Sequence, residues 1–182
     1  MQKMVIFLVS TAISLVVVGS IVGFLIVYQK GLPDTERTSK IRREFYASNP
    51  NPAMSLTDEQ AIIEFNEDFV EYLMYDLGAN ELHHAPFSFD SPKIEIKVEE
   101  QIFSVEVLGG EIFVDDEQIN EEDIIIHTTR EEAVKMLKDE EHVIESFNEG
   151  KSWIEPKASK TKLFSKGYLD IYKKLTGEDA EF

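Results

Sequence analysis

IEIKVEEQIFSVEVLGGEIFV, residues 94–114, is the stretch of this sequence that decides the fold. Apolar and polar side chains alternate over residues 94–98 and again over residues 103–107. A period of two is typical of strands that bury one face. Gly109-Gly110 then separates the second run from residues 112–114, and a glycine pair between alternating runs is a strong hairpin signal. We therefore predict three consecutive strands.

The sequence beyond this stretch predicts two more strands. Residues 115–123 are strongly acidic and read as a solvated turn, without the spaced ligands and glycine of a calcium loop. Residues 123–128 (DIIIHT) are continuously apolar at their centre, which favours a strand inside the sheet. Residues 152–155 are predicted as the last strand, ended by Pro156.

Helical signals lie before and after the strands. Thr57 and Gln60 form a capping-box pattern, and apolar residues recur at helical spacing from there to Leu77, before Gly78. Shorter helices are expected after Thr129 and over residues 143–147, and one closing helix carries an apolar stripe from Phe164 to Leu175. The predicted fold class is α+β, a mostly antiparallel sheet covered by helices.

The N-terminal stretch, residues 4–29, contains no charged side chain. About 20 apolar residues cross the hydrocarbon core of a bilayer, so we predict a single-pass transmembrane anchor over residues 1–30. A cleaved signal peptide is the main alternative, but its apolar part would be only ~7–15 residues long. Gly19 and Gly23 have the G-x-x-x-G spacing of a helix-mediated homodimer contact, although glycine is common in such segments.

The remaining chain is divided into a linker, residues 31–56, and a soluble domain, residues 57–182. Prolines and a turn-forming sequence near residue 50 favour a flexible linker, which would span ~28 Å. More basic residues follow the anchor than precede it, and the positive-inside rule then favours a cytoplasmic soluble domain in a single-pass membrane protein.

Charge and motifs exclude several functions. Residues 31–182 hold 16 of the 18 basic side chains and all 35 acidic ones, a net charge of −19, which opposes nucleic-acid binding. The chain has no cysteine and none of the common nucleotide-binding, metalloprotease or hydrolase motifs. His83-His84 lacks a third ligand at a suitable spacing and is expected in a surface loop. We expect no enzyme, no cofactor and no metal.

From residue 103 to residue 175 the order of elements resembles the sterol carrier protein 2 (SCP2-like) domain. The resemblance is carried by VLGGEI at residues 107–112, by IIIHTT at residues 124–129 and by EAVKML at residues 132–137. Its most specific part is SFNEGK at residues 146–151 followed by WIE, which is similar to the family pattern a-f-x-x-G-K-l-x-I-x-G. Pro156 departs from the glycine that is usual there.

The resemblance implies a non-catalytic module that encloses lipids, sterols or acyl chains in an apolar tunnel. By position, the tunnel would be lined by Phe103, Val105, Ile126, Phe147, Trp153, Phe164, Tyr168, Ile171 and Tyr172. Each of these residues also suits an ordinary packed core, and sequence alone does not separate a tunnel wall from a core.

Lysines gather near the C-terminus of an otherwise acidic domain. Our hypothesis is that they face anionic lipid; the alternative is a solvated basic face. The set is Lys157, Lys160, Lys162, Lys166, Lys173 and Lys174. The predicted function is a membrane-tethered, non-catalytic module that binds a lipid or another apolar small molecule. The alternative is a membrane-anchored adaptor, with a solid core and an acidic surface that recruits a basic protein.

Overall fold

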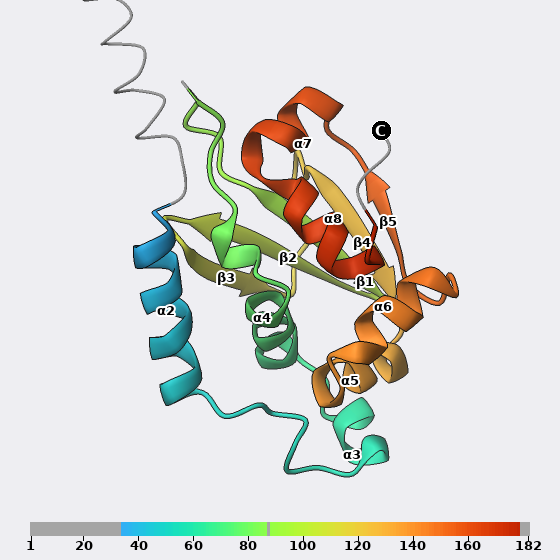
Figure 1. The fold of residues 1–182 in the computed structure, drawn as a ribbon. Helices are drawn as coiled ribbons and strands as arrows, with labels where there is room; N and C mark the ends of the chain where they lie inside the picture. The colour runs from blue at the N-terminus through green and yellow to red at the C-terminus, as the bar shows by residue number, and fades with distance from the viewer. Residues whose placement is uncertain (1–33, 87, 179–182) are drawn as a thin grey trace, which may run out of the picture.

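The computed structural model describes residues 34–86 and 88–178 of the chain. They form one mixed sheet of five strands, with helices packed over one of its faces (Figure 1). The predicted α+β class is therefore confirmed. Hydrophobic side chains from the helices and from one side of the sheet form a single core cluster between the two layers.

The sheet has the predicted strands in a mostly antiparallel arrangement. The strand order is β3-β2-β1-β4-β5, and every pairing is antiparallel except that of β1 with β4. Both glycines of the Gly109-Gly110 turn have positive φ, 62° and 94°, as a tight hairpin requires. β4 lies between two partners, as its apolar sequence predicts. The strands are β1 (Lys93–Val98), β2 (Gln101–Leu108), β3 (Glu111–Asp115), β4 (Ile124–Thr128) and β5 (Trp153–Pro156).

Two predicted helices are each divided into two. The first is interrupted after Ile63 because Asn66 adopts an extended conformation and its side chain accepts the Asp68 N–H, which starts a new helix. The last is divided at Gly167, whose φ of 88° ends the preceding helix in the left-handed region. The helices are α3 (Asp58–Ile63), α4 (Glu67–Asp76), α5 (Arg130–Lys138), α6 (Glu141–Asn148), α7 (Lys160–Lys166) and α8 (Tyr168–Thr176).

The structure differs from the sequence prediction in the segment 31–56, which was expected to be a flexible linker. Within it, α2 (Thr35–Ser48) is a helix of 14 residues that lies beside the sheet (Figure 1). Phe45 stacks on Tyr75 with ring centroids 3.9 Å apart. The Tyr46 hydroxyl donates to Asp76 at 2.5 Å. These contacts fasten α2 to α4, so the helix is part of the domain.

The helical signal in this segment was present but weak. Thr38, Ile41, Phe45 and Tyr46 fall on one side of a helix by their spacing, and the flanking prolines lie outside α2 instead of interrupting it. Because most other positions are polar, composition favoured a linker. Packing against α4 supplies the stability that this short sequence lacks on its own.

The predicted anchor, residues 1–30, lies outside the described residues, together with Gly19 and Gly23. Among residues 34–86 and 88–178, none of the helices has the length and apolar character needed to cross a bilayer.

Removing the Phe45 ring should destabilise the docking of α2. We expect Phe45→Ala to lower the free energy of unfolding by about 2 kcal/mol, less than a fully buried phenylalanine would cost because the ring is only partly buried. Urea unfolding of the full chain in detergent, followed by tryptophan fluorescence, measures this. Lys40→Ala, at an exposed position of the same helix, is the control and should change stability by less than about 0.5 kcal/mol. Equal stability of both variants would contradict the docking.

Candidate functional site

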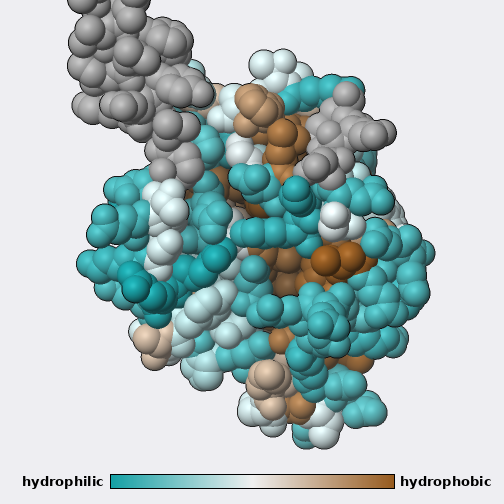
Figure 2. Space-filling model, in the orientation of Figure 1, coloured by the Kyte–Doolittle hydropathy of each residue, from teal (hydrophilic) through white to brown (hydrophobic). Residues whose placement is uncertain are grey.

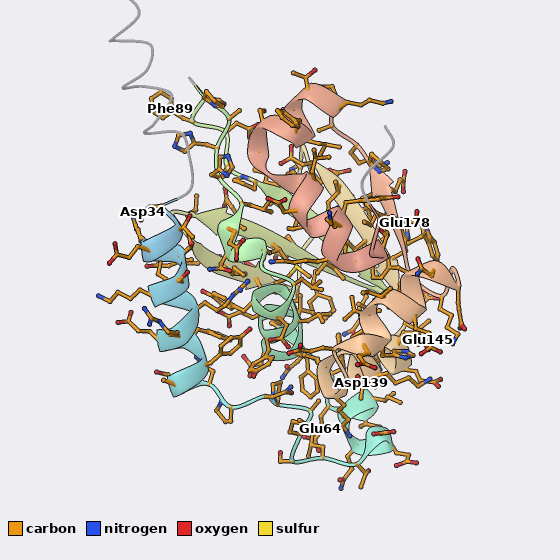
Figure 3. All side chains as sticks on the ribbon, in the orientation of Figure 1. Asp34, Glu64, Phe89, Asp139, Glu145 and Glu178 are labelled. Atoms are coloured by element: carbon orange, nitrogen blue, oxygen red, sulfur yellow. The ribbon has the colours of Figure 1, made fainter. Side chains whose placement is uncertain are left out.

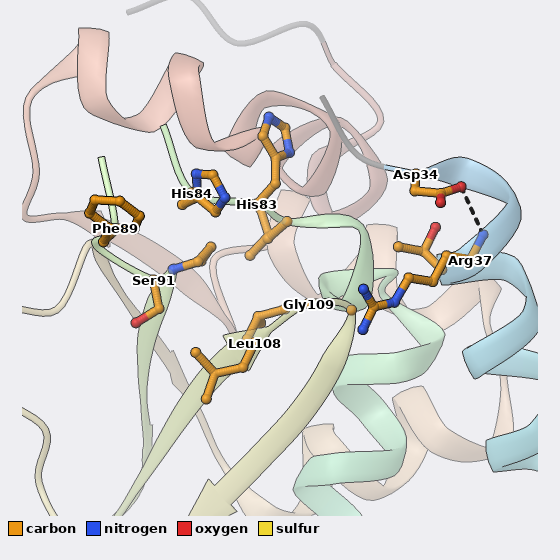
Figure 4. Close-up of a pocket in the computed structure, with 13 residues that line it drawn as sticks. Asp34, Arg37, His83, His84, Phe89, Ser91, Leu108 and Gly109 are labelled. Atoms are coloured by element: carbon orange, nitrogen blue, oxygen red, sulfur yellow. Dashed lines mark hydrogen bonds between the residues drawn. The ribbon is translucent and has the colours of Figure 1, made fainter. Parts of the chain in front are cut away.

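A pocket of about 240 Å³ lies at the end of the domain where α2 begins. Three segments that are distant in sequence form it: the first turn of α2, the loop of residues 82–92, and the turn between β2 and β3 (Figure 4). Each segment is held by a separate set of contacts, so the pocket exists only in the folded domain.

The floor of the pocket is apolar. Leu82 and Val107 are buried there, and Pro92 and Leu108 extend the apolar wall. The β2–β3 turn approaches α2 closely at Gly110, where a Cβ atom would lie 3.1 Å from the side chain of Ile41. The glycine pair therefore both makes the hairpin turn and lets it pack beside the helix.

The rim of the pocket is polar. Asp34 is the N-cap of α2, and its carboxylate accepts the backbone N–H of Arg37 at 3.1 Å. The guanidinium of Arg37 extends over Gly109, where a Cβ atom would lie 3.1 Å from it (Figure 4). His83 and His84 line the rim beyond Gly109. Burial lowers the pKa of His83, which favours the neutral imidazole near pH 7.

Phe89 stands at the mouth of the pocket and is fully exposed. Figure 3 shows it on the same side of the molecule as Asp34, away from Glu64 and Asp139. A fully exposed phenylalanine has no packing role within the domain, so its side chain is available to a ligand or surface outside it. The face shown in Figure 2 is otherwise mainly hydrophilic, with separate hydrophobic patches.

A buried ion pair holds the loop of residues 82–92 against α7. Lys166 is 0% exposed, and its ammonium lies 2.8 Å from the carboxylate of Asp123 and 3.0 Å from that of Asp90. It also donates to the carbonyl of Ser91 at 2.8 Å. A separate backbone hydrogen bond joins the same residue to the loop: the N–H of His83 donates to the Lys166 carbonyl at 3.2 Å. One lysine thus fixes two pocket-lining residues.

Two neighbouring side chains, Lys162 and Tyr168, add further contacts to this pair. Lys162 lies 2.8 Å from Asp90 and 2.9 Å from Asp123. The Tyr168 hydroxyl donates to Asp123 at 3.0 Å, and burial raises the pKa of this phenol. The hydrogen bond from Lys162 is the main reason that the pKa of Asp90 is lowered. The cluster therefore has a buried centre, Lys166 and Asp123, with Lys162 and Asp90 at its partly exposed edge.

The predicted lipid-binding residues do not border a common tunnel in the described structure. Near Tyr168, Ile171 and Tyr172 the space between α8 and the sheet is only about 10 Å³, which is at the lower limit for a single water molecule. Trp153 and Phe164 are exposed. The remaining members of the set are packed in or against the core: Phe103, Val105, Ile126 and Phe147.

Trp153 lies on the opposite side of the sheet from this core. Its cross-strand partner is His127, and the two rings stack with centroids 4.5 Å apart. Its neighbour Ile154 packs against the core instead, as strand alternation requires. The predicted set is therefore divided between the two faces of the sheet.

The predicted lysine surface is also divided. The prediction that Lys166 lies on the surface is wrong. Its side chain is buried because it forms an ion pair with Asp123, which lies inside the domain. Lys162 joins the same cluster, and Lys157 pairs with Glu155 at 2.8 Å. The other predicted members, Lys160, Lys173 and Lys174, are exposed.

Arg37, Phe89 and Leu108 are not among the site residues that the sequence predicts, and His83-His84 is predicted only as part of a surface loop. No local pattern marks these residues, because the pocket arises from three segments that meet only in the fold. No group of three histidine, aspartate or glutamate side chains within residues 34–86 and 88–178 is arranged to hold a metal ion.

No family model matches the chain, and no curated protein matches it either. Among solved structures, it is similar to a ubiquinone synthesis protein, UbiJ-SCP2, with a TM-score of 0.31 and 10% identity over 41% of this chain. It is also similar to a double mutant of the sec-alkyl sulfatase PisA1, with a TM-score of 0.31 and 11% identity over 50% of this chain. The chain spans 62% and 13% of the lengths of those two proteins. At these TM-scores neither likeness supports a functional assignment.

Removing the buried ammonium should strongly destabilise the domain. Lys166→Met leaves Asp123 buried with one cation fewer, and we expect a loss of about 3 kcal/mol in the free energy of unfolding. Lys160→Met, at an exposed position of the same helix, should change it by less than about 0.5 kcal/mol. Urea unfolding of the full chain in detergent provides both values, and similar losses in the two variants would rule out a special role for Lys166.

The ion cluster should also make stability depend on acid. Because the pKa of Asp90 is lowered in the folded state, its contribution is complete above its ordinary pKa of about 4 and is lost as the pH falls through the lowered value. Asp90→Asn should therefore be less stable than the natural chain at pH 6, and the difference should shrink below pH 4. Urea midpoints measured between pH 3 and pH 6 test this, and a constant difference would contradict it.

Proposed function

We propose that the protein is a membrane-tethered, non-catalytic module that binds a lipid or another apolar small molecule in the pocket at the start of α2. One observation carries the proposal: a pocket of about 240 Å³ with an apolar floor opens beside Asp34 and Arg37, at the start of α2. The sequence of residues 4–29 suits a membrane anchor, as argued above.

The docking of α2 supports this placement. Gln29 and Asp34 are five residues apart, a distance of at most ~17 Å in an extended chain. With α2 fastened to α4, this short stretch replaces the long flexible linker that the sequence suggested. An anchor at residues 1–30 would therefore keep the pocket close to the surface of the bilayer.

The size of the pocket limits what enters it. Pockets that bury a drug-sized ligand usually measure ~300–1,000 Å³, so 240 Å³ suits only part of a lipid. The remainder of the molecule would stay in the bilayer or against Phe89 at the mouth. In this proposal the domain presents or senses a lipid at the membrane without extracting it completely.

The proposal assigns no chemistry to the pocket. Its one serine hydroxyl among the lining residues, that of Ser91, donates to Glu106 rather than to an imidazole. His83 lies 3.4 Å from the carbonyl of Glu81, and Asp34 is engaged as a helix cap. A nucleophile beside a general base is the minimum for covalent catalysis. We further propose that the domain is cytoplasmic, from the basic residues that follow the anchor sequence.

The second candidate is a membrane-anchored adaptor with a solid core. Close packing between α8 and the sheet favours it, with about 10 Å³ of free space there. The sheet face turned away from the helices also carries partly exposed carboxylates, among them Glu106 and Glu155. A basic partner would suit that surface.

Photo-crosslinking distinguishes these functions. The full chain, reconstituted in nanodiscs of neutral phospholipid, is irradiated with a photoactivatable fatty acid, and labelled peptides are mapped by mass spectrometry. We expect labelling of residues 34–41, 82–92 and 107–110. Leu108→Glu should reduce it several-fold, because a carboxylate would replace an apolar part of the pocket wall.

Phe113→Glu is the matched control for this substitution. Phe113 is 50% exposed and Leu108 is 48% exposed, but Phe113 lies outside the pocket. The control should therefore leave pocket labelling unchanged. Labelling confined to residues 4–29 would refute lipid binding by the domain and favour the adaptor.

A further inference from the structure

The charges that line the pocket contrast with those of the domain around it. Residues 31–182 have a net charge of −19, yet the pocket is lined by Arg37, His83 and His84 and by a single acid, Asp34. The Asp34 carboxylate already accepts the backbone N–H of Arg37 as a helix cap. With the histidines neutral, the charges of Arg37 and Asp34 cancel, so the rim carries no net charge within an otherwise acidic domain.

Arg37 has no counter-ion within the part of the chain that the structure describes. No carboxylate there lies within 4.0 Å of its guanidinium, although α2 carries other basic side chains that are paired, such as Lys40 with Glu44 at 3.7 Å. In Figure 4 the guanidinium points over Gly109 towards the pocket. An unpaired guanidinium beside an apolar wall offers planar, bidentate donors to a phosphate or carboxylate.

The backbone at Gly109 permits this position. Its φ is 62°, and a Cβ atom there would lie 3.1 Å from the Arg37 Nη2 atom and crowd the guanidinium. The start of α2 lies on the same side and adds a partial positive charge. The hairpin turn and the helix thus place the cation where an anionic group would meet the apolar floor.

We infer that the pocket selects a lipid with an anionic head group, a phosphate monoester or a carboxylate, and that Arg37 binds this group. The inference rests on the proposed function and specifies its ligand: Leu82, Val107 and Leu108 contact the first part of the acyl chain, and Arg37 pairs with the head. Free inorganic phosphate has the same head-group chemistry, and the experiment separates the two sources.

The test compares two photoactivatable lipids that differ only in the phosphate, lysophosphatidic acid and monoacylglycerol, with the full chain in neutral nanodiscs. We expect the phosphate-bearing probe to label the pocket about tenfold more strongly. Arg37→Gln should reduce its labelling to the level of monoacylglycerol and leave monoacylglycerol labelling unchanged. Arg37→Lys should retain part of the preference, because it keeps the charge and loses the bidentate geometry.

Arg43→Gln is the matched control, since Arg43 is exposed on the same helix and does not line the pocket. It should preserve the preference for the phosphate-bearing probe. Equal labelling by both lipids, unchanged in Arg37→Gln, would overturn the anion inference and leave lipid binding intact.

Inorganic phosphate provides the remaining comparison. We expect millimolar phosphate to leave labelling by lysophosphatidic acid unchanged, because it lacks the acyl chain that contacts the floor. Binding of inorganic phosphate that depends on Arg37, without pocket labelling by either lipid, would support the anion site and refute the lipid function. If neither lipid labels the pocket and inorganic phosphate does not bind, both the lipid function and the anion site at Arg37 are overturned.

Discussion

The buried pairing of Lys166 with Asp123 is the interaction on which the arrangement of this domain depends. Removing both charges from water carries a desolvation cost that only close, fully hydrogen-bonded geometry offsets. Here the ammonium groups of Lys162 and Lys166 and the hydroxyl of Tyr168 each lie within 3.0 Å of the Asp123 carboxylate. Because an alternative packing would leave a charge unpaired, the cluster specifies where α7 and α8 sit on the sheet. The buried charges thus contribute to the uniqueness of the fold.

The same cluster connects the core to the candidate site. Lys166 bonds to the carbonyl of Ser91 and, through its own carbonyl, to the N–H of His83. These two bonds hold both ends of the loop that forms one wall of the pocket. The opposite wall depends on α2, which is held by aromatic packing of Phe45 and Tyr46 against α4. The two walls of the pocket are therefore held by separate sets of contacts.

In the proposed function, this geometry determines how the domain would meet the membrane. A flexible linker would let the domain sample many orientations, whereas a docked α2 would restrict which surface faces the proposed anchor. The surface so placed carries Phe89, the apolar floor and Arg37. A lipid tunnel under α8 would need space between that helix and the sheet, where only about 10 Å³ is free. The proposed binding site lies at the end of the domain where α2 begins.

The strands, the capping box at Thr57 and the hairpin at Gly109-Gly110 were predictable because each follows from local periodicity or turn chemistry. The breaks at Asn66 and Gly167 were not, since an apolar stripe continues across both. Neither was the role of Lys166, because a lysine in a basic stretch shows no sign that a distant aspartate will bury it. The pocket was the least predictable feature, as its walls come from three separate segments.

The sequence by itself determined the α+β class, the acidic character of the domain and the apolar N-terminal stretch, all of which depend on composition and on neighbours along the chain. Only the tertiary structure decided that α2 is docked, that two of the predicted surface lysines are paired with Asp123, and that Arg37 meets an apolar floor. The physical reason is the range of the interactions. Periodicity and capping act over a few residues, whereas burial and charge pairing join residues that the chain separates by dozens of positions.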